Sequence, residues 1–337
     1  MTLFLLLSCG SGSAKVEDPK TTFLNSIANL GRGFLDVFTS LSDMVAGAFG
    51  IKADTKKSDI GKYFTSIETT MNTVKKKLQE EVAKNGNYSK VKKVVDTFIT
   101  NTLDKIAAGA KEAAKGATTD TAIGNAVKNQ DAKPANAESI NSLVKGIKTI
   151  VGVVLKSNEG NAEATKTAED EQKSIGKLLS GKGASDGEEK HAAAASASIG
   201  AVTGADILKA IAKSAETADK VDLDQAKDAA SIAAAKKDVA ADFTDARKDA
   251  VIAAGIALRA MAKDGKLAAK TGEDKSAHAI NGAVASAVGK TLSTLIIAIR
   301  NTVDSGLKTI SEALAAVKQE DKSTEATTPA ETATSGQ

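Results

Sequence analysis

The side chains of this chain that could do chemistry are few: one cysteine and two histidines among 337 residues. The cysteine, Cys9, follows a short apolar run, Leu3 to Leu7, and precedes the small residues 10–13. This run is too short to span a bilayer, which takes about 20 residues. An apolar run, a small residue and then a cysteine is the order typical of a bacterial lipoprotein signal, in which the thiol becomes acylated.

We therefore predict that residues 1–8 are a signal segment. Cys9 would become the first residue of the mature chain and carry N-palmitoyl and S-diacylglycerol groups. The alternative is a cysteine buried at the start of a domain behind a chance run of leucines. No Lys or Arg precedes Leu3, although signal segments ordinarily begin with a positive charge. This departure predicts that Met1 is internal to a longer reading frame, or that the signal is truncated.

The two histidines do not predict a metal or catalytic site. His191 and His278 are far apart, and neither has a second His, a Cys or paired carboxylates at ligand spacing. His191 lies in a charged helix start, so we expect it in solvent; His278 lies in an Ala-rich helix, so we expect it partly buried. Gly289-Lys290-Thr291 is similar to the end of a phosphate loop, but Val284 stands where the first glycine belongs. We predict no enzyme, no metal and no cofactor other than the covalent lipid.

Lysines cluster on two neighbouring expected helices, at Lys75, Lys76 and Lys77 and again at Lys92 and Lys93. Together they predict a basic patch that would bind a polyanion, such as a sulphated glycosaminoglycan or an anionic lipid surface. Ordinary solvated lysines are the simpler interpretation. The net charge of +3 is small for this length and does not indicate a nucleic-acid partner.

The composition predicts that helices position these residues. The chain has no Trp, two Tyr, eight Phe and three Pro, and many of its hydrophobic residues are Ala. This favours helix, and no clean alternating strand pattern is present. The longest apolar stretch after the signal, residues 295–299, is too short to cross a membrane. We predict an all-α fold: a flexible tether at 9–20, one elongated helical bundle at 21–318, and a disordered tail at 319–337.

Apolar residues recur at three- and four-residue steps, which predicts amphipathic helices. The expected helices cover residues 23–45, 60–82, 91–110, 140–155, 192–211, 248–263 and 276–318, with weaker pieces at 121–127 and 175–179. Residues 216–244 are rich in Ala, Asp and Lys, so we expect them to be helical by propensity but peripheral. The first and last long helices carry strong aliphatic stripes, and we expect them to pack together at the membrane end.

Long stretches of the chain resemble the variable large proteins of relapsing-fever Borrelia, a family related to the Lyme-disease antigen VlsE. These stretches are residues 91–115, 143–156, 170–179, 189–214, 256–270 and 276–315. Residues 257–266, ALRAMAKDGK, are similar to the invariable antibody-recognised segment of VlsE. The resemblance covers nearly the whole chain and implies a helical lipoprotein of the outer membrane, facing the exterior. It also implies a family that expresses one gene copy at a time and replaces it by recombination to evade antibody.

The leading hypothesis is therefore a non-catalytic antigen whose partners are the membrane, through its lipid, and host antibodies. Leu258 and Met261 would then be buried, which keeps the 257–266 segment from antibodies on intact cells. The alternative is an adhesin that binds host glycosaminoglycan or protein through the five lysines. The missing charge before Leu3 further suggests an archived copy that depends on an expression site for its start.

Overall fold

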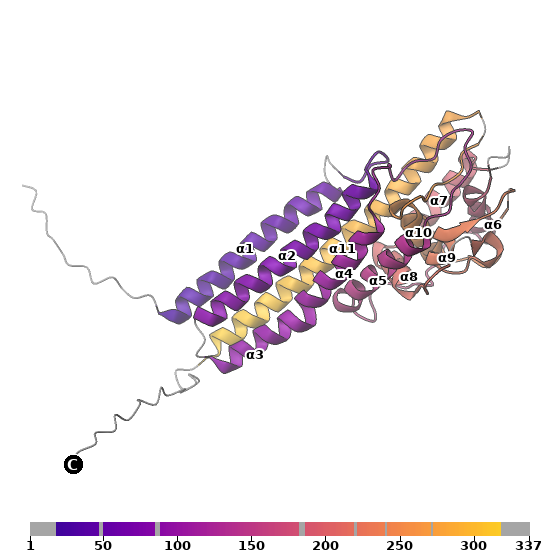
Figure 1. The fold of residues 1–337 in the computed structure, drawn as a ribbon. Coiled ribbons are helices and arrows are strands. Elements are labelled where there is room, and N and C mark those ends of the chain that lie inside the picture. Colours follow the sequence, from indigo (N-terminus) through magenta and orange to yellow (C-terminus); the bar gives the residue numbers. More distant parts are fainter. Residues whose placement is uncertain are drawn as a thin grey trace, which may run out of the picture.

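The structure, a computed structural model, describes residues 18–46, 50–84, 88–181, 186–218, 221–239, 241–270 and 272–317. The predicted signal segment, Cys9 and the predicted tail at 319–337 lie outside the described residues. The described part is an elongated, mostly helical molecule, with a shaft of long helices at one end and a head of short elements at the other (Figure 1). The predicted all-α fold is confirmed.

Long helical runs form the shaft, and residues 89–116 make one such run from three consecutive pieces. The elements of the shaft are α1 (Pro19–Ala46), α2 (Lys57–Lys84), α3 (Ser89–Phe98), the π-helical turn η1 (Ile99–Leu103), α4 (Asp104–Gly116) and α11 (Asp274–Ala315). At about 1.5 Å per residue, the 42 residues of α11 extend roughly 60 Å and reach from the shaft into the head (Figure 1). α1 packs on α11 in the opposite direction, and Lys20 Nζ donates to the carbonyl of Val317 at 3.2 Å. The first and last long helices therefore pack together, as predicted, with both of their outer ends at the far end of the shaft.

The predicted apolar stripes form the core of the shaft. On α2 the buried stripe comprises Ile60, Phe64, Ile67, Met71, Val74 and Leu78. Between α2 and α11, the buried Tyr63 hydroxyl donates to the carbonyl of Leu292 at 2.9 Å. The Phe98 ring lies against Gly306, where an added Cβ would come within 2.0 Å of it, so any larger residue at 306 would require this ring to move.

α11 is the one described helix that is long and apolar enough to cross a membrane. More than half of its most apolar window, 56%, is buried inside the protein. A central core helix needs the same length and composition, because neighbours surround it on most sides. The burial identifies α11 as the core helix that joins the shaft to the head.

Short elements form the head. They are α5 (Ala137–Val154), α6 (Glu169–Ser174), the 3-10 helix η2 (Ile175–Leu179), α7 (Glu189–Ala201), α8 (Gly204–Lys213), β1 (Val221–Asp222), the 3-10 helix η3 (Leu223–Gln225), α9 (Ala229–Ala234), β2 (Ala235–Lys236) and α10 (Asp249–Met261). The two strands are parallel, with Val221 opposite Ala235. α5 packs on α4, where a Cβ on Gly146 would lie 2.4 Å from the carbonyl oxygen of Gly109. The α5 backbone thus approaches α4 more closely than larger residues would permit.

Three predictions about the head and its connections are wrong. Residues 192–211 are two helices, because α7 ends at Ala201 and α8 leaves it at 98°. A capping box between Thr203 and Asp206 starts α8 there. Residues 216–244 are not peripheral: their short elements include α9, whose alanines are buried against α10. Residues 121–127 are extended, since Ile123 pairs with the backbone of residue 55 instead of forming a helix.

Candidate functional site

The segment 257–266 forms the end of α10 and the turn after it. Leu258 and Met261 are fully buried, which confirms the expectation from the sequence. The turn is made at Asp264, whose φ of +67° lies in the left-handed region that Asp tolerates better than most residues. Lys263 and Asp264 are the exposed residues of the segment, and Lys266 is half-buried. A molecule approaching from solvent therefore meets the tip of the turn and little else of this segment.

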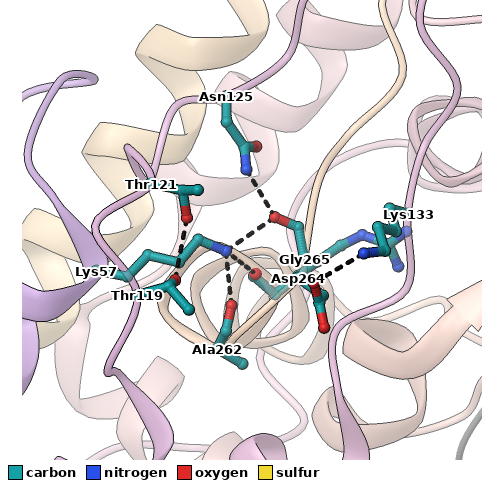
Figure 2. Close-up of polar contacts among 9 residues, drawn as sticks. Lys57, Thr119, Thr121, Asn125, Lys133, Ala262, Asp264 and Gly265 are labelled. Atoms are coloured by element: carbon teal, nitrogen blue, oxygen red, sulfur yellow. Dashed lines mark hydrogen bonds and ion pairs between the residues drawn. The ribbon is translucent and has the colours of Figure 1, made fainter.

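A buried lysine from the shaft binds the carbonyl end of α10 (Figure 2). Lys57, the first residue of α2, is 0% exposed. Its Nζ donates to the carbonyl oxygens of Ala262 at 2.6 Å, Gly265 at 2.8 Å and Arg259 at 3.5 Å. The last carbonyls of a helix have no donor within the helix, and its carbonyl end favours a positive charge. Lys57 thus satisfies the end of α10 from outside the head.

Burial opposes the charge of this lysine. Desolvation, and after it the positive charge of Arg259, lowers the pKa of Lys57 from 10.5 to about 7. The carboxylate of Asp264 acts in the opposite direction, and the ammonium of Lys133 adds a smaller repulsion. The site therefore places a buried amine mainly among carbonyl oxygens, which accept its hydrogen bonds.

A second buried cation belongs to the segment itself and binds α9 and the residue after it. Arg259 is 1% exposed, and its Nη1 donates to the carbonyls of Ala235 at 2.6 Å and Ala233 at 3.1 Å. Its Nε donates to the carbonyl of Lys266 at 3.0 Å. Burial lowers the pKa of Arg259 to about 9. Like Lys57, Arg259 donates its hydrogen bonds to carbonyl oxygens and not to a buried carboxylate. These bonds connect the end of α9 to the turn after α10.

An extended strap, residues 119–136, covers the turn from the shaft side. Asn125 Nδ2 donates to the carbonyl of Gly265 at 2.9 Å, the same oxygen that Lys57 binds (Figure 2). Lys133 and Lys266 exchange backbone hydrogen bonds of 3.0 and 2.9 Å. The strap is itself anchored on α2, because the Lys57 amide donates to the carbonyl of Thr121 at 2.9 Å.

At the start of α10, a buried carboxylate organises the neighbouring loops. Asp249 accepts hydrogen bonds from the amides of Lys166 and Thr167 at 2.6 and 2.9 Å. It also accepts from the hydroxyls of Thr167 and Ser198, both at 2.6 Å, and from the Gln172 amide at 3.2 Å. Burial alone would raise the pKa of Asp249, but these hydrogen bonds outweigh it and hold the pKa below its ordinary value. No pattern in the sequence marks this residue, because its partners, on the 165–168 loop and on helices α6 and α7, are 51 to 83 positions away.

The two histidines lie in the reverse of the expected environments. His191 is buried, 1% exposed, and its Nδ1 accepts a hydrogen bond from the Glu188 amide at 3.2 Å, which caps α7. Desolvation lowers its pKa to about 4. His278 is exposed on α11. The prediction for His191 is wrong because its charged neighbours are exposed, whereas its own ring packs inward and caps the helix.

The five predicted patch lysines lie on two helices of the shaft that contact each other, α2 and α3. Lys76, Lys77, Lys92 and Lys93 are exposed, and Lys75 is half-buried. Three of the five form ion pairs: Lys75 with Asp104 at 2.7 Å, Lys76 with Glu80 at 3.9 Å, and Lys92 with Asp96 at 2.5 Å. The ion pairs reduce the positive charge of the patch, and its binding of a polyanion stays a prediction.

Within the described ranges, no three His, Cys, Asp or Glu side chains are grouped so that they could hold a metal ion. An open cavity of about 830 Å³ lies between the strap and the β1–β2 pair. Its lysines face carboxylates: Lys133 pairs with Asp264 at 2.7 Å and Lys236 with Asp238 at 3.0 Å. The cavity therefore offers paired surface charges without an activated nucleophile.

Comparisons with known proteins converge on one group. A family model described as Borrelia lipoprotein matches residues 34–314. The chain is 66% identical to variable large protein 4 of Borrelia hermsii, covering 100% of this chain and 97% of that protein. It is 65% identical to variable large protein 17 of the same organism, covering 100% and 96%. The crystal structure of the variable surface antigen VlsE of Borrelia burgdorferi aligns with a TM-score of 0.72 at 38% identity, over 87% of this chain and 99% of that one.

Proposed function

Because the chain belongs to the Borrelia lipoprotein family, and within it to the variable large proteins, we propose that it is a lipid-anchored outer-membrane antigen that serves antigenic variation and evasion of host antibody. Variable large proteins are non-catalytic surface antigens, so the chain is not an enzyme. The observation that carries the proposal is the burial of the 257–266 segment beneath the strap and the head. A shared segment that is buried escapes antibody, while the exposed residues around it are free to vary.

The positions of the chain ends support membrane anchoring. In the proposal, residues 1–8 are removed, Cys9 carries the acyl groups, and residues 9–20 are a tether to a single domain at 21–318, followed by a disordered tail at 319–337. Asp18 comes nine positions after Cys9, and at about 3.5 Å per position this connection spans at most about 32 Å. The start of α1 would therefore stay close to the lipid layer, with the end of α11 beside it (Figure 1). The shaft helix α2 has 28 residues, so an upright shaft would hold the head roughly 40 Å beyond the end of the tether.

Acylation and exposure can be tested together in cultured Borrelia that express the chain behind a complete signal segment. Metabolic palmitate should label the wild type but not a Cys9→Ser variant. Protease added to intact cells should degrade the labelled protein. Unlabelled wild type, or wild type that whole-cell proteolysis spares, would refute the anchored antigen.

A second candidate function is an adhesin, favoured by the exposure of four of the five patch lysines on adjacent helices. Such a protein would bind heparin less strongly as the salt concentration rises, because dissolved ions screen the attraction between the sulphate groups and the lysines. Replacing Lys75, Lys76 and Lys77 with Gln should then release the protein at lower salt. Equal elution of the variant and the wild type would remove this candidate.

A further inference from the structure

Lys57 makes more hydrogen bonds to the 257–266 segment than any other side chain that the structure describes outside the segment. Its three acceptors, the carbonyls of Arg259, Ala262 and Gly265, all belong to the last turn of α10 and the turn after it. The side chain comes from the shaft, 202 to 208 positions earlier in the sequence. One ammonium thus connects the shaft to the segment whose concealment we propose above.

The same residue also holds the strap in place. Its backbone amide donates to Thr121, and the neighbouring Ser58 amide donates to Thr119 at 2.8 Å. Four residues beyond Thr121, the strap reaches Gly265 through Asn125 (Figure 2). The start of α2, the strap and the end of α10 therefore meet at Lys57. A side-chain substitution there leaves the backbone hydrogen bonds to the strap in place and removes only the donor to the segment.

The ammonium is buried, so its hydrogen bonds depend on the closed arrangement of the segment. In the closed arrangement, the three carbonyls replace the water that Lys57 would otherwise bind, and Arg259 lies close enough to repel it. If the turn moves away, water can hydrate both the ammonium and the carbonyls, so an opened segment does not leave buried polar groups unpaired. If Lys57 is replaced by an apolar residue, the closed form instead keeps three buried carbonyls without this donor, and opening becomes the way to satisfy them.

We propose that Lys57 is a latch: its hydrogen bonds to the end of α10 keep the 257–266 segment closed, and their loss exposes that segment to antibody while the shaft stays folded. The inference rests on the proposed concealment of this segment from antibody. It adds the residue that controls the concealment, and it places that residue on the shaft, outside the segment itself.

The test compares the purified full-length wild type with a Lys57→Met variant. Met keeps a similar length and removes the donor. Lys62→Met is the matched control, because Lys62 lies on the same helix, its side chain is 76% exposed and it pairs with Asp59. Hydrogen exchange of the amides in 257–266 should be at least tenfold faster in Lys57→Met. Exchange on α2 and α11, and all exchange in Lys62→Met, should match the wild type.

An antibody raised against a peptide of residues 257–266 supplies the second readout. It should bind native Lys57→Met at least tenfold more strongly than native wild type, and bind both equally after unfolding. Strong binding to the native wild type would refute the concealment and so the proposed function. Weak binding to both native proteins, with unchanged exchange, would overturn the latch and leave the proposed function intact.

A Lys57→Gln variant covers the case in which Lys57→Met loses its helical circular dichroism. Gln keeps an amide donor on a shorter side chain, so its segment should exchange at a rate between those of the wild type and an open segment. If in this variant the shaft and the segment exchange faster by the same factor, Lys57 supports the whole fold and the latch is refuted.

Discussion

The shaft and the head of this molecule are held together by different kinds of side chains. In the shaft, large residues such as Phe64 and Leu295 are fully buried at helical spacing. In the head, α9 is mostly alanine, and five of the 13 residues of α10 are alanines, such as the fully buried Ala254. An alanine methyl buries little apolar area, so the same number of residues contributes less hydrophobic stabilisation in the head.

Buried polar groups supply what the alanines of the head lack. Small side chains let backbones approach closely, which brings carbonyls and amides within reach of the few long or charged side chains present. Arg259 and Asp249 are both buried, and their hydrogen bonds connect elements that are far apart in the sequence. The comparison teaches that the shaft depends on side-chain volume, whereas the head depends on hydrogen bonds to the backbone.

The largest expected effect comes from emptying the shaft core. Phe64→Ala should lower the free energy of unfolding by about 4 kcal/mol, because it removes a fully buried aromatic ring and leaves a cavity. Urea denaturation followed by circular dichroism measures this. Gln79→Ala, on the exposed face of the same helix, should change it by no more than about 0.5 kcal/mol. Similar effects for the two variants would contradict the view that the stability of the shaft depends on buried side-chain volume.

The matching change in the head alters hydrogen bonding at nearly constant volume. Asp249→Asn should lower the free energy of unfolding by about 3 kcal/mol, because one acceptor oxygen becomes a donor among the amides and hydroxyls that now bind the carboxylate. The exposed Asp245→Asn is the control in the same denaturation experiment. If Asp249→Asn is as stable as the wild type, these hydrogen bonds do not stabilise the head.

Acid should weaken the head through His191. Its pKa is about 4 when folded and 6.5 in the reference state, so between these values the unfolded chain binds more protons than the folded one. The free energy of unfolding therefore falls as pH falls from 6.5 to 4, by up to about 3 kcal/mol, and changes no further through this group below pH 4. In His191→Gln, which keeps a capping side chain, this dependence should be absent. Parallel pH profiles for the two proteins would contradict it.

The smallest expected effect comes from adding volume to the alanine core. Ala254→Leu should lower the free energy of unfolding by about 2 kcal/mol, because the closely packed backbones around α10 leave no room for an isobutyl group. Ala315→Leu, at an exposed position on α11, serves as the control. If Ala254→Leu is tolerated as well as the control, the head is less closely packed than its alanines indicate.

The periodicity of the sequence predicts the long helices of the shaft. Regularly spaced large residues predict α2 and α11 because a helix must turn one apolar face inward, and that requirement is local. The burial of Leu258 and Met261 was predicted as well, from the resemblance to the family. The acylation of Cys9 stays a prediction, outside the described residues.

The arrangement of the head and the contacts that close the 257–266 segment follow from long-range packing, which the sequence does not reveal. Alanine favours helix without marking a face, so the bend between α7 and α8 and the burial of 216–244 left no periodic signal. Lys57 binds Ala262 across 205 positions. Its acceptors are main-chain carbonyls, which every residue carries, so no choice of side chain in the sequence identifies the partners of this lysine.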